Sequence, residues 1–232
     1  VIAVELPFTP PGLPHIYHRH WVELGHCASQ LVAISQHTRR TYQQYISKPN
    51  HLTVPISTAY LPNFLKAHEG SIGETCVHCL HGRKFVVYCS TIETRKNHQL
   101  LLHIWDRLRQ ELDADQLPVL VFIGKWGWGT ELVRLLVERN WRLNPHLQVM
   151  TEVSDDELIW LYKNALFSVF PSHSEGFGLG AAESLSFGTP VVISNAPALV
   201  EATEGLMPAY DPMDFPAWLN EIRELCKNSD HL

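Results

Sequence analysis

Two glutamates flank a glycine-rich stretch in the segment EGFGLGAAE, which runs from Glu175 to Glu183. A helix that begins near Gly176 would point unpaired backbone N–H groups, and the positive end of its dipole, at an anionic ligand. Glycines there let a phosphate approach the backbone closely. Because carboxylates accept hydrogen bonds from a diol, the two acids suit the two sugars of a nucleotide diphosphate sugar.

Helical spacing gives this hypothesis a scale. In a helix the two glutamates would lie about 12 Å apart, at about 1.5 Å per residue, which is the distance from hexose to ribose in such a donor. We therefore expect Glu175 at the transferred sugar, Glu183 at the ribose, and Lys96 with the glycine amides at the diphosphate. Simpler interpretations stay open, because acids stabilise many first helical turns and glycine-rich turns are frequent. A lone lysine is more often a solvated surface charge.

The elements that must position these residues alternate along the chain from about residue 82. Short apolar runs predict strands at 85–89, 119–124, 147–153, 166–170 and 189–194. Helices are predicted from about residue 97, over 130–140, after a Ser154 cap, over about 176–188 and over about 214–225. This alternation predicts an α/β fold with a Rossmann-like doubly wound parallel sheet.

Ligands of such a sheet bind beyond the carboxyl ends of its strands. Three loops with unusual residues follow predicted strands, at 90–97, 125–129 and 171–180. Trp126 and Trp128 in the second loop suit either a wall for the donor or simple packing.

The first eighty residues are less regular. Residues 31–35 and 36–45 predict one more strand–helix pair, which cannot build a second sheet alone, and 51–81 predict a linker. Within that range, Cys76, Cys79 and His81 supply only half of a zinc site unless other histidines complete it. We therefore expect no metal site.

Composition excludes several classes of protein. The net charge of −6 without a basic run argues against a nucleic-acid partner. Five scattered cysteines predict reduced thiols instead of a disulfide framework. Since no apolar run reaches the length of a membrane helix, we expect a soluble, cytoplasmic protein.

In four ordered segments the chain resembles the retaining glycosyltransferases of family 4, which have the two-domain GT-B fold. They are STIETRKNHQLLL, VFIGKWGWG, VSDDELIWLYKNALFSVFPSHSEGFGLG and EGFGLGAAE. The match covers about 82–225 and is most similar to the bacterial O-antigen and capsule mannosyltransferase branch. It implies that 82–232 form the donor-binding domain and that 1–50, with LVAISQHTRR, are a remnant of the acceptor domain. We therefore expect the natural chain to extend upstream of Val1.

The resemblance also implies roles for single residues. Glu175 and Lys96 would be catalytic. The donor-binding residues would be Thr91, Arg95, Val153, Gly176, Phe177, Gly178 and Glu183. Such enzymes retain the anomeric configuration and are usually metal-independent, so no cofactor is expected.

This sequence departs from the family pattern at several places. Gly180 and Thr94 stand where proline is usual, and Gly180 would loosen the helix start. Ser90 and Thr91 occupy a region where related families carry an arginine. The missing positive charge would weaken diphosphate binding. VIAVELPF aligns with a V-x-H-D-L-x-P segment, so that Val4 and Glu5 replace a His-Asp pair near the donor sugar.

These observations predict transfer of a hexose from GDP-mannose or a UDP-hexose to a glycan or lipid-linked acceptor, with peripheral contact at the inner membrane. The alternative is a non-catalytic relative that binds a nucleotide or a partner protein, and this chain could be inactive alone. Sugar-nucleotide epimerases and phosphorylases also use GT-B domains. The loop that carries Lys96, together with the two glutamates of EGFGLGAAE (an E-x7-E pattern), argues against these classes.

Overall fold

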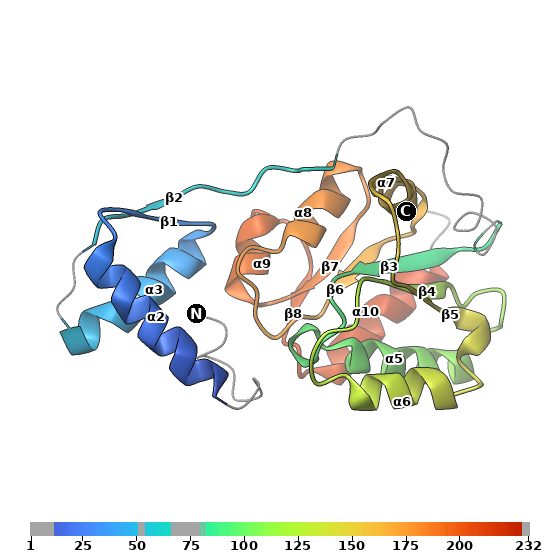
Figure 1. The fold of residues 1–232 in the computed structure, drawn as a ribbon. Helices are drawn as coiled ribbons and strands as arrows, with labels where there is room; N and C mark the ends of the chain where they lie inside the picture. Colours follow the sequence, from blue (N-terminus) through green and yellow to red (C-terminus); the bar gives the residue numbers. More distant parts are fainter. Residues whose placement is uncertain (1–11, 51–53, 66–79, 81, 229–232) are drawn as a thin grey trace.

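The computed structural model describes residues 12–50, 54–65, 80 and 82–228. Figure 1 shows a small N-terminal part beside a larger α/β part. The N-terminal part contains α2 (Leu13–Cys27), β1 (Leu31–Ala33), α3 (Gln36–Asn50) and β2 (Ile56–Thr58). Val4, Glu5, Cys76, Cys79 and His81, which carried expectations from the sequence, lie outside the described residues.

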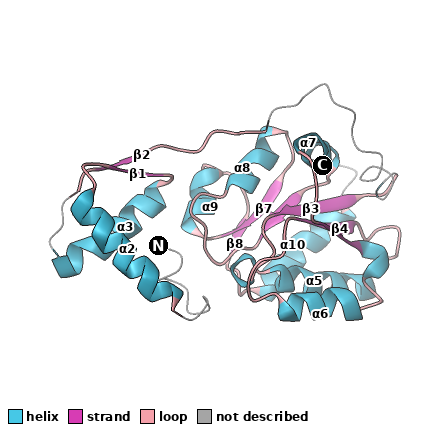
Figure 2. Ribbon diagram, viewed as in Figure 1, coloured by secondary structure: helices cyan, strands magenta, loops and turns pink. Residues whose placement is uncertain are grey.

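The larger part is a six-stranded parallel sheet with helices on both faces (Figure 2). Its strands are β3 (Phe85–Cys89), β4 (Val119–Ile123), β5 (Leu147–Met150), β6 (Ser168–Phe170), β7 (Val191–Ser194) and β8 (Ala209–Tyr210). Its helices are α5 (His98–Glu111), α6 (Glu131–Arg139), α7 (Asp155–Asn164), α8 (Leu179–Ser186), α9 (Pro197–Ala202) and α10 (Phe215–Lys227), with short 3₁₀ turns η1 (Thr94–Lys96) and η2 (Asn144–His146). The predicted doubly wound sheet is confirmed.

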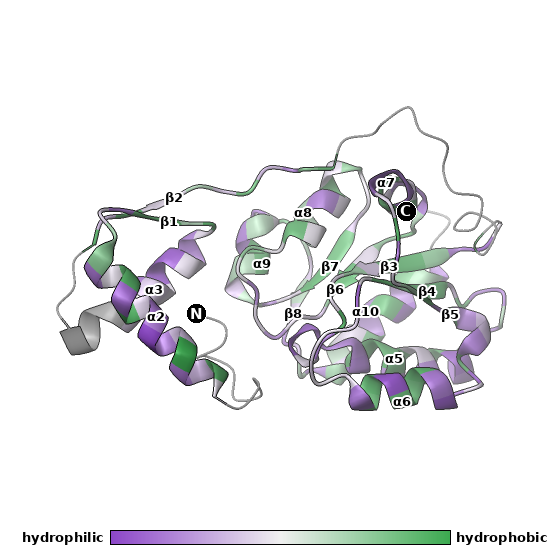
Figure 3. Cartoon of the chain, viewed as in Figure 1, coloured by the Kyte–Doolittle hydropathy of each residue, from purple (hydrophilic) through white to green (hydrophobic). Residues whose placement is uncertain are grey.

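The central strands are buried on both faces, which explains their continuous apolar sequence. In β3, Val86 and Tyr88 pack into a cluster with residues of α5 and α10. Phe85 and Val87 point the other way and pack with Leu161 of α7. Figure 1 accordingly places α7 on one side of the sheet and α5, α6 and α10 on the other. Figure 3 shows these central strands largely in hydrophobic green.

The strand order places a crevice in the middle of the sheet. The order is β5-β4-β3-β6-β7-β8, so the chain winds outward from β3 in one direction and from β6 in the other. Loops that leave neighbouring β3 and β6 therefore diverge, and the space between them is where ligands of such sheets bind.

Several boundaries differ from those predicted. Helix α8 begins at Leu179 and not near Gly176, because its N-cap Gly178 is left-handed, with φ of 106°. Residues 175–178 are therefore not helical, and the 12 Å helical estimate does not apply. The expected Ser154 cap is confirmed as a full capping box with Glu157. Helix α9 and strand β8 were not predicted.

The N-terminal part contains a sheet of its own. Strand β2, within the range predicted as a linker, pairs in parallel with β1. The predicted strand–helix pair therefore does build a small sheet, because β2 from the predicted linker supplies the partner strand. A small core of Trp21, Ala33, Tyr42 and Ile56 supports it.

The described residues include neither a membrane-spanning helix nor a metal-binding cluster. None of the helices there is long and apolar enough to cross a bilayer. The same residues contain no group of three or more His, Cys, Asp or Glu side chains arranged to hold a metal ion.

Gly124, directly after β4, lies so close to the loop after β3 that we expect it to tolerate no side chain. Its φ is 145°, and a Cβ would lie 2.1 Å from the Ser90 carbonyl oxygen. We expect Gly124→Ala to lower the free energy of unfolding by about 2–4 kcal/mol, from strain plus steric overlap. Urea denaturation measures this loss.

Gly188 provides the matched control. Its φ is 86°, but a Cβ there would meet nothing within 4 Å. Gly188→Ala should therefore cost only the left-handed conformation, about 1–2 kcal/mol. Equal losses for the two variants would contradict the close approach of these two loops.

Candidate functional site

A cavity of about 400 Å³ opens at the carboxyl ends of β3 and β6. Cys89 and Ser90 at the end of β3 and Phe170 at the end of β6 lie at its base. Its further lining residues are Ile34, Leu61, Arg95, Lys96, Glu175, Gly176, Phe177, Gly178, Leu179, Gly180 and Glu183. The cavity thus occupies the crevice that the strand order creates.

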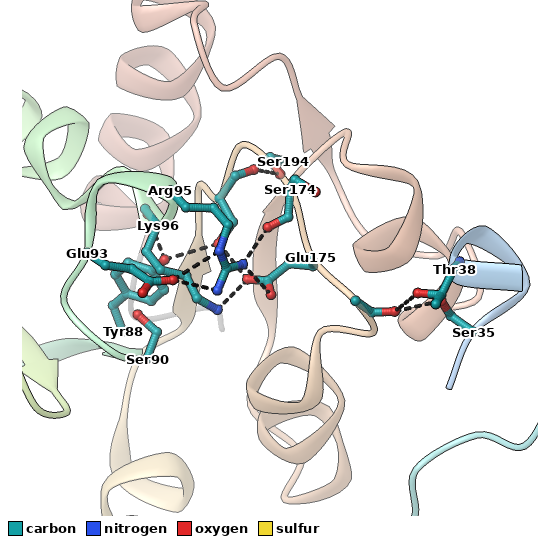
Figure 4. Close-up of polar contacts among 12 residues, drawn as sticks. Ser35, Thr38, Tyr88, Ser90, Glu93, Arg95, Lys96, Ser174, Glu175 and Ser194 are labelled. Atoms are coloured by element: carbon teal, nitrogen blue, oxygen red, sulfur yellow. Dashed lines mark hydrogen bonds and ion pairs between the residues drawn. The ribbon is translucent and has the colours of Figure 1, made fainter. Parts of the chain in front are cut away.

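Glu175 is buried in this cavity and held by two cations (Figure 4). Lys96 Nζ lies 2.5 Å from Oε1, and Arg95 Nη1 lies 3.0 Å from Oε2. Ser172 Oγ donates a further hydrogen bond of 2.7 Å to Oε1. Burial raises the pKa of Glu175, but the charges of Lys96 and Arg95 and these hydrogen bonds outweigh it, so the pKa is lowered. The carboxylate is therefore ionised at neutral pH.

Arg95 connects the loop at 90–97, which also carries Lys96, to the loop at 171–180, which carries Glu175. Besides Glu175, its guanidinium contacts the Glu93 carboxylate at 2.6 Å and donates to the Ser174 carbonyl oxygen at 2.6 Å. Arg95 and Lys96 together balance the charges of Glu93 and Glu175. With its donors used by these groups, Arg95 positions Glu175.

Tyr88 supports the same cluster from beneath. Its hydroxyl donates to the Lys96 carbonyl oxygen at 2.7 Å and lies 3.2 Å from Ser172 Oγ, the group that donates to Glu175. Burial raises the pKa of Tyr88 far above its usual range, so the phenol keeps its proton. Its ring stacks on His98 at the start of α5, with centroids 4.5 Å apart. One buried phenol therefore holds both loops.

Glu183 has the opposite environment. Its side chain lines the cavity from α8 and is 8% exposed, yet among the described residues no hydrogen bond or ion pair to its carboxylate is found. Burial, and secondarily the charge of Asp155, raises the pKa of Glu183 to about 7. A buried acceptor without a donor is ready for a ligand that brings one, such as a hydroxyl group.

The start of α8 supplies hydrogen-bond donors to the cavity. No side chain caps this helix, and Leu179 and Gly180 of its first turn line the cavity. Its positive dipole end and first N–H groups therefore suit an anion. A Cβ on Gly180 would lie 3.0 Å from the Cys89 carbonyl oxygen and 2.9 Å from the Phe170 ring, so close packing accounts for glycine at this position.

The structure brings most of the predicted site residues together. Those that line the cavity are Arg95, Lys96, Glu175, Gly176, Phe177, Gly178 and Glu183. Thr91 and Val153 are not among the lining residues, and Val153 packs instead beside the core under α7. The Trp126 ring packs against the main core with the Arg134 guanidinium 4.1 Å above it, which favours the packing interpretation.

Sequence reasoning missed several lining residues. Cys89, Phe170 and Leu179 could have been found, because they end a predicted strand or adjoin the glycine-rich segment. Ile34 and Leu61 come from the N-terminal part, and no sequence signal indicated that they reach this cavity.

A family model described as "Glycosyl transferases group 1" matches residues 80–207. O-antigen chain mannosyltransferase B of Escherichia coli is 36% identical over 133 residues, which are 57% of this chain and 34% of that protein. A D-inositol 3-phosphate glycosyltransferase of Corynebacterium kroppenstedtii is 28% identical over 199 residues, 80% of this chain and 43% of that protein. The chain thus spans less than half the length of these two curated relatives.

Solved structures match nearly the whole chain in fold. Sucrose-phosphate synthase from Thermosynechococcus elongatus aligns with a TM-score of 0.72 and 18% identity, covering 98% of this chain and 56% of that one. TarM aligns with a TM-score of 0.69 and 13% identity, covering 97% and 42%. The six-stranded sheet with its flanking helices therefore matches the fold of GT-B glycosyltransferases.

The pKa of Glu183 predicts how stability depends on pH. The carboxyl has its usual pKa of about 4.5 when unfolded and about 7 when folded. Between these values the folded chain holds a proton that the unfolded chain has released, so stability falls as the pH rises through this window. We expect Glu183→Gln to lack this fall in urea denaturation from about pH 4.5 to about pH 7. A pH-independent difference between wild type and variant would contradict the raised pKa.

Tyr88→Phe tests the phenol beneath the cluster. The variant leaves the partly buried Lys96 carbonyl without its donor, so we expect a loss of about 1–3 kcal/mol in unfolding free energy. Tyr162→Phe is the control, since among the described residues the buried Tyr162 hydroxyl has at most the Cys89 thiol as a weak partner. That variant should be neutral or slightly stabilising. Losses of the same size in both would show that the Tyr88 hydroxyl holds nothing.

Proposed function

Because the chain belongs to the group 1 glycosyl transferases, we propose that it transfers a hexose from a nucleotide diphosphate sugar to a glycan or lipid-linked acceptor. The observation that carries this proposal is that one cavity contains two glutamates with different surroundings. Glu175 is neutralised by cations, whereas Glu183 is buried without a partner among the described residues. We further propose that the anomeric configuration is retained, as the resemblance to family 4 implies.

The donor would lie across the start of α8. Glu183 suits the ribose, because its carboxylate can accept hydrogen bonds from both hydroxyls of a diol. The uncapped N–H groups of α8 suit the diphosphate. Glu175, on the other side of these amides, then faces the hexose.

Lys96 would change partner when the donor binds. In the free chain its ammonium is paired with Glu175 at 2.5 Å. A diphosphate offers this ammonium a stronger anion, while the hexose hydroxyls offer Glu175 new donors. Arg95 remains to hold Glu175 in place. After the exchange Arg95 still contacts Glu175, and Lys96 pairs with the diphosphate.

In the transfer, the anomeric carbon exchanges its bond to the diphosphate for a bond to the acceptor oxygen. The acceptor's proton is carried off by the released nucleoside diphosphate or by buffer. Lys96 and the α8 amides would stabilise the negative charge that develops on the leaving group. These protein groups supply positive charge to the diphosphate, so we propose that transfer needs no metal ion.

Relatives guide the choice of substrate. Several are named as O-antigen chain mannosyltransferases or as serotype-specific mannosyltransferases. Mannose from GDP-mannose is therefore the first donor to test, with UDP-hexoses second. If the acceptor is linked to a lipid, the transfer would take place at the inner face of a bacterial membrane.

Calorimetric binding of GDP-mannose and UDP-glucose tests the donor site. We expect binding by the wild type and a loss of about tenfold or more in Lys96→Ala, since hydrogen bonds to charged groups contribute about 1.5–3 kcal/mol. Glu183→Ala should weaken binding through the lost ribose contacts. Lys125→Ala, an exposed lysine one loop away, is the control.

Two results would contradict the proposal: no nucleotide sugar binds, or Lys96→Ala binds as tightly as wild type. Binding without transfer to any acceptor would favour the alternative of a non-catalytic nucleotide-binding relative. Transfer that Glu175→Gln abolishes would support the enzyme.

A further inference from the structure

The N-terminal part contacts the cavity wall through the beginning of α3. Figure 4 shows Ser35 and Thr38 pointing from this region toward the loop that carries Glu175. Ser35 Oγ donates to the Gly176 carbonyl oxygen at 2.6 Å, and Thr38 Oγ1 donates to the same oxygen at 2.9 Å. Ser35 is fully buried and also accepts the Thr38 N–H at 3.0 Å, so it caps α3 while it holds Gly176.

A second contact with the start of α3 comes from a side chain of α9. The Glu201 carboxylate accepts the backbone N–H of Gln36 at 2.6 Å and that of His37 at 2.9 Å. Both groups belong to the first turn of α3, where N–H groups lack helical partners and the dipole favours a negative charge. Glu201 therefore binds the helix start by charge and geometry together.

Apolar contacts accompany these bonds. The Tyr60 ring lies 6.0 Å from the Phe177 ring, measured between centroids. Ile34 Cδ1 would lie 3.3 Å from a Cβ on Gly176. Ile34, Gly176 and Phe177 all line the cavity, so the contact with the N-terminal part runs along its wall.

The Gly176 carbonyl has a special place in this wall. It follows Glu175 directly in the chain, and its peptide also carries the N–H of Phe177. Since the peptide is planar and trans, fixing the carbonyl toward α3 fixes the Phe177 N–H in the opposite direction. Phe177 lines the cavity, so the orientation of its N–H, like that of the Gly176 carbonyl, depends on two hydroxyls of the N-terminal part.

We propose that Ser35, Thr38 and Glu201 form a latch that fixes the Gly176 peptide for binding the sugar end of the donor. The inference rests on the proposed function and adds residues from outside the donor-binding motifs to it. None of the three lines the cavity, so they act as positioning residues. By linkage, a donor that needs the fixed peptide must also stabilise the latch.

Binding calorimetry on the full chain tests the latch with two probes, GDP-mannose and GMP. The double variant Ser35→Ala/Thr38→Ala should bind the nucleotide sugar about tenfold more weakly and GMP within about twofold of wild type, because Gly176 adjoins Glu175 and the GMP ribose lies at Glu183. A purely structural defect would weaken both probes equally. Restoring one hydroxyl, as Ser35→Ala/Thr38→Ser, should recover part of the loss.

Ser57→Ala is the matched control. Among the described residues its hydroxyl interacts with Gln30 and the Leu31 carbonyl, both in the N-terminal part. It should leave both affinities unchanged.

Amide exchange gives a second readout. Glu201→Gln should speed hydrogen exchange at the Gln36 and His37 N–H groups, and GDP-mannose should slow this exchange in wild type. This measurement decides the question if the double alanine variant does not fold.

The outcomes separate the latch from the proposed function. If wild type binds GDP-mannose while the double variant binds it equally well, or donor leaves exchange at Gln36 and His37 unchanged, the latch is overturned and the donor site stands. If wild type binds neither GDP-mannose nor UDP-glucose, the proposed function fails and the latch fails with it.

Discussion

The site depends on one constraint, which is that a buried carboxylate must be neutralised. Glu175 lies in the cavity at the carboxyl ends of β3 and β6, where an unpaired charge would cost several kcal/mol. Lys96 and Arg95 supply the compensating charges from the loop after β3. Because the carboxylate and the cations leave different strands, their pairing joins the two halves of the sheet at the point where its strand order reverses. Tyr88 then fixes both loops from below.

The two glutamates of the E-x7-E segment differ in what surrounds them. Glu175 has three donors and a lowered pKa, whereas Glu183 is desolvated, without a donor among the described residues, and has a pKa of about 7. Sequence spacing alone presents them as equivalent acids. The left-handed Gly178 separates them, since it places Glu175 in a loop and Glu183 inside a helix. Their environments thus suit an ionised group held for a hexose and an acceptor awaiting a ribose.

Much of the fold was predictable, for physical reasons that also mark the limits. Buried strands such as 85–89 and 119–123 have continuous apolar sequence, and Ser154 with Glu157 forms a local cap that needs no tertiary information. The start of α8 was mispredicted because a glycine leaves the chain free to delay the helix. The short β2 carries too few residues to give a pattern, and its pairing with β1 is non-local. The same holds for the site: the motif residues were predictable, but Ile34 and the contacts of Ser35 depend on tertiary packing.

The central claim is that the cavity binds a nucleotide diphosphate sugar through an exchange of partners at Lys96. A crystal structure of this chain with GDP-mannose or a UDP-hexose tests it most directly. The account predicts the diphosphate at the start of α8 within hydrogen-bond distance of Lys96 Nζ, the ribose hydroxyls on Glu183, and Glu175 turned to the hexose while Arg95 still holds it. A nucleotide bound elsewhere, or bound here with the Lys96–Glu175 pair intact and Glu183 without a contact, would contradict it.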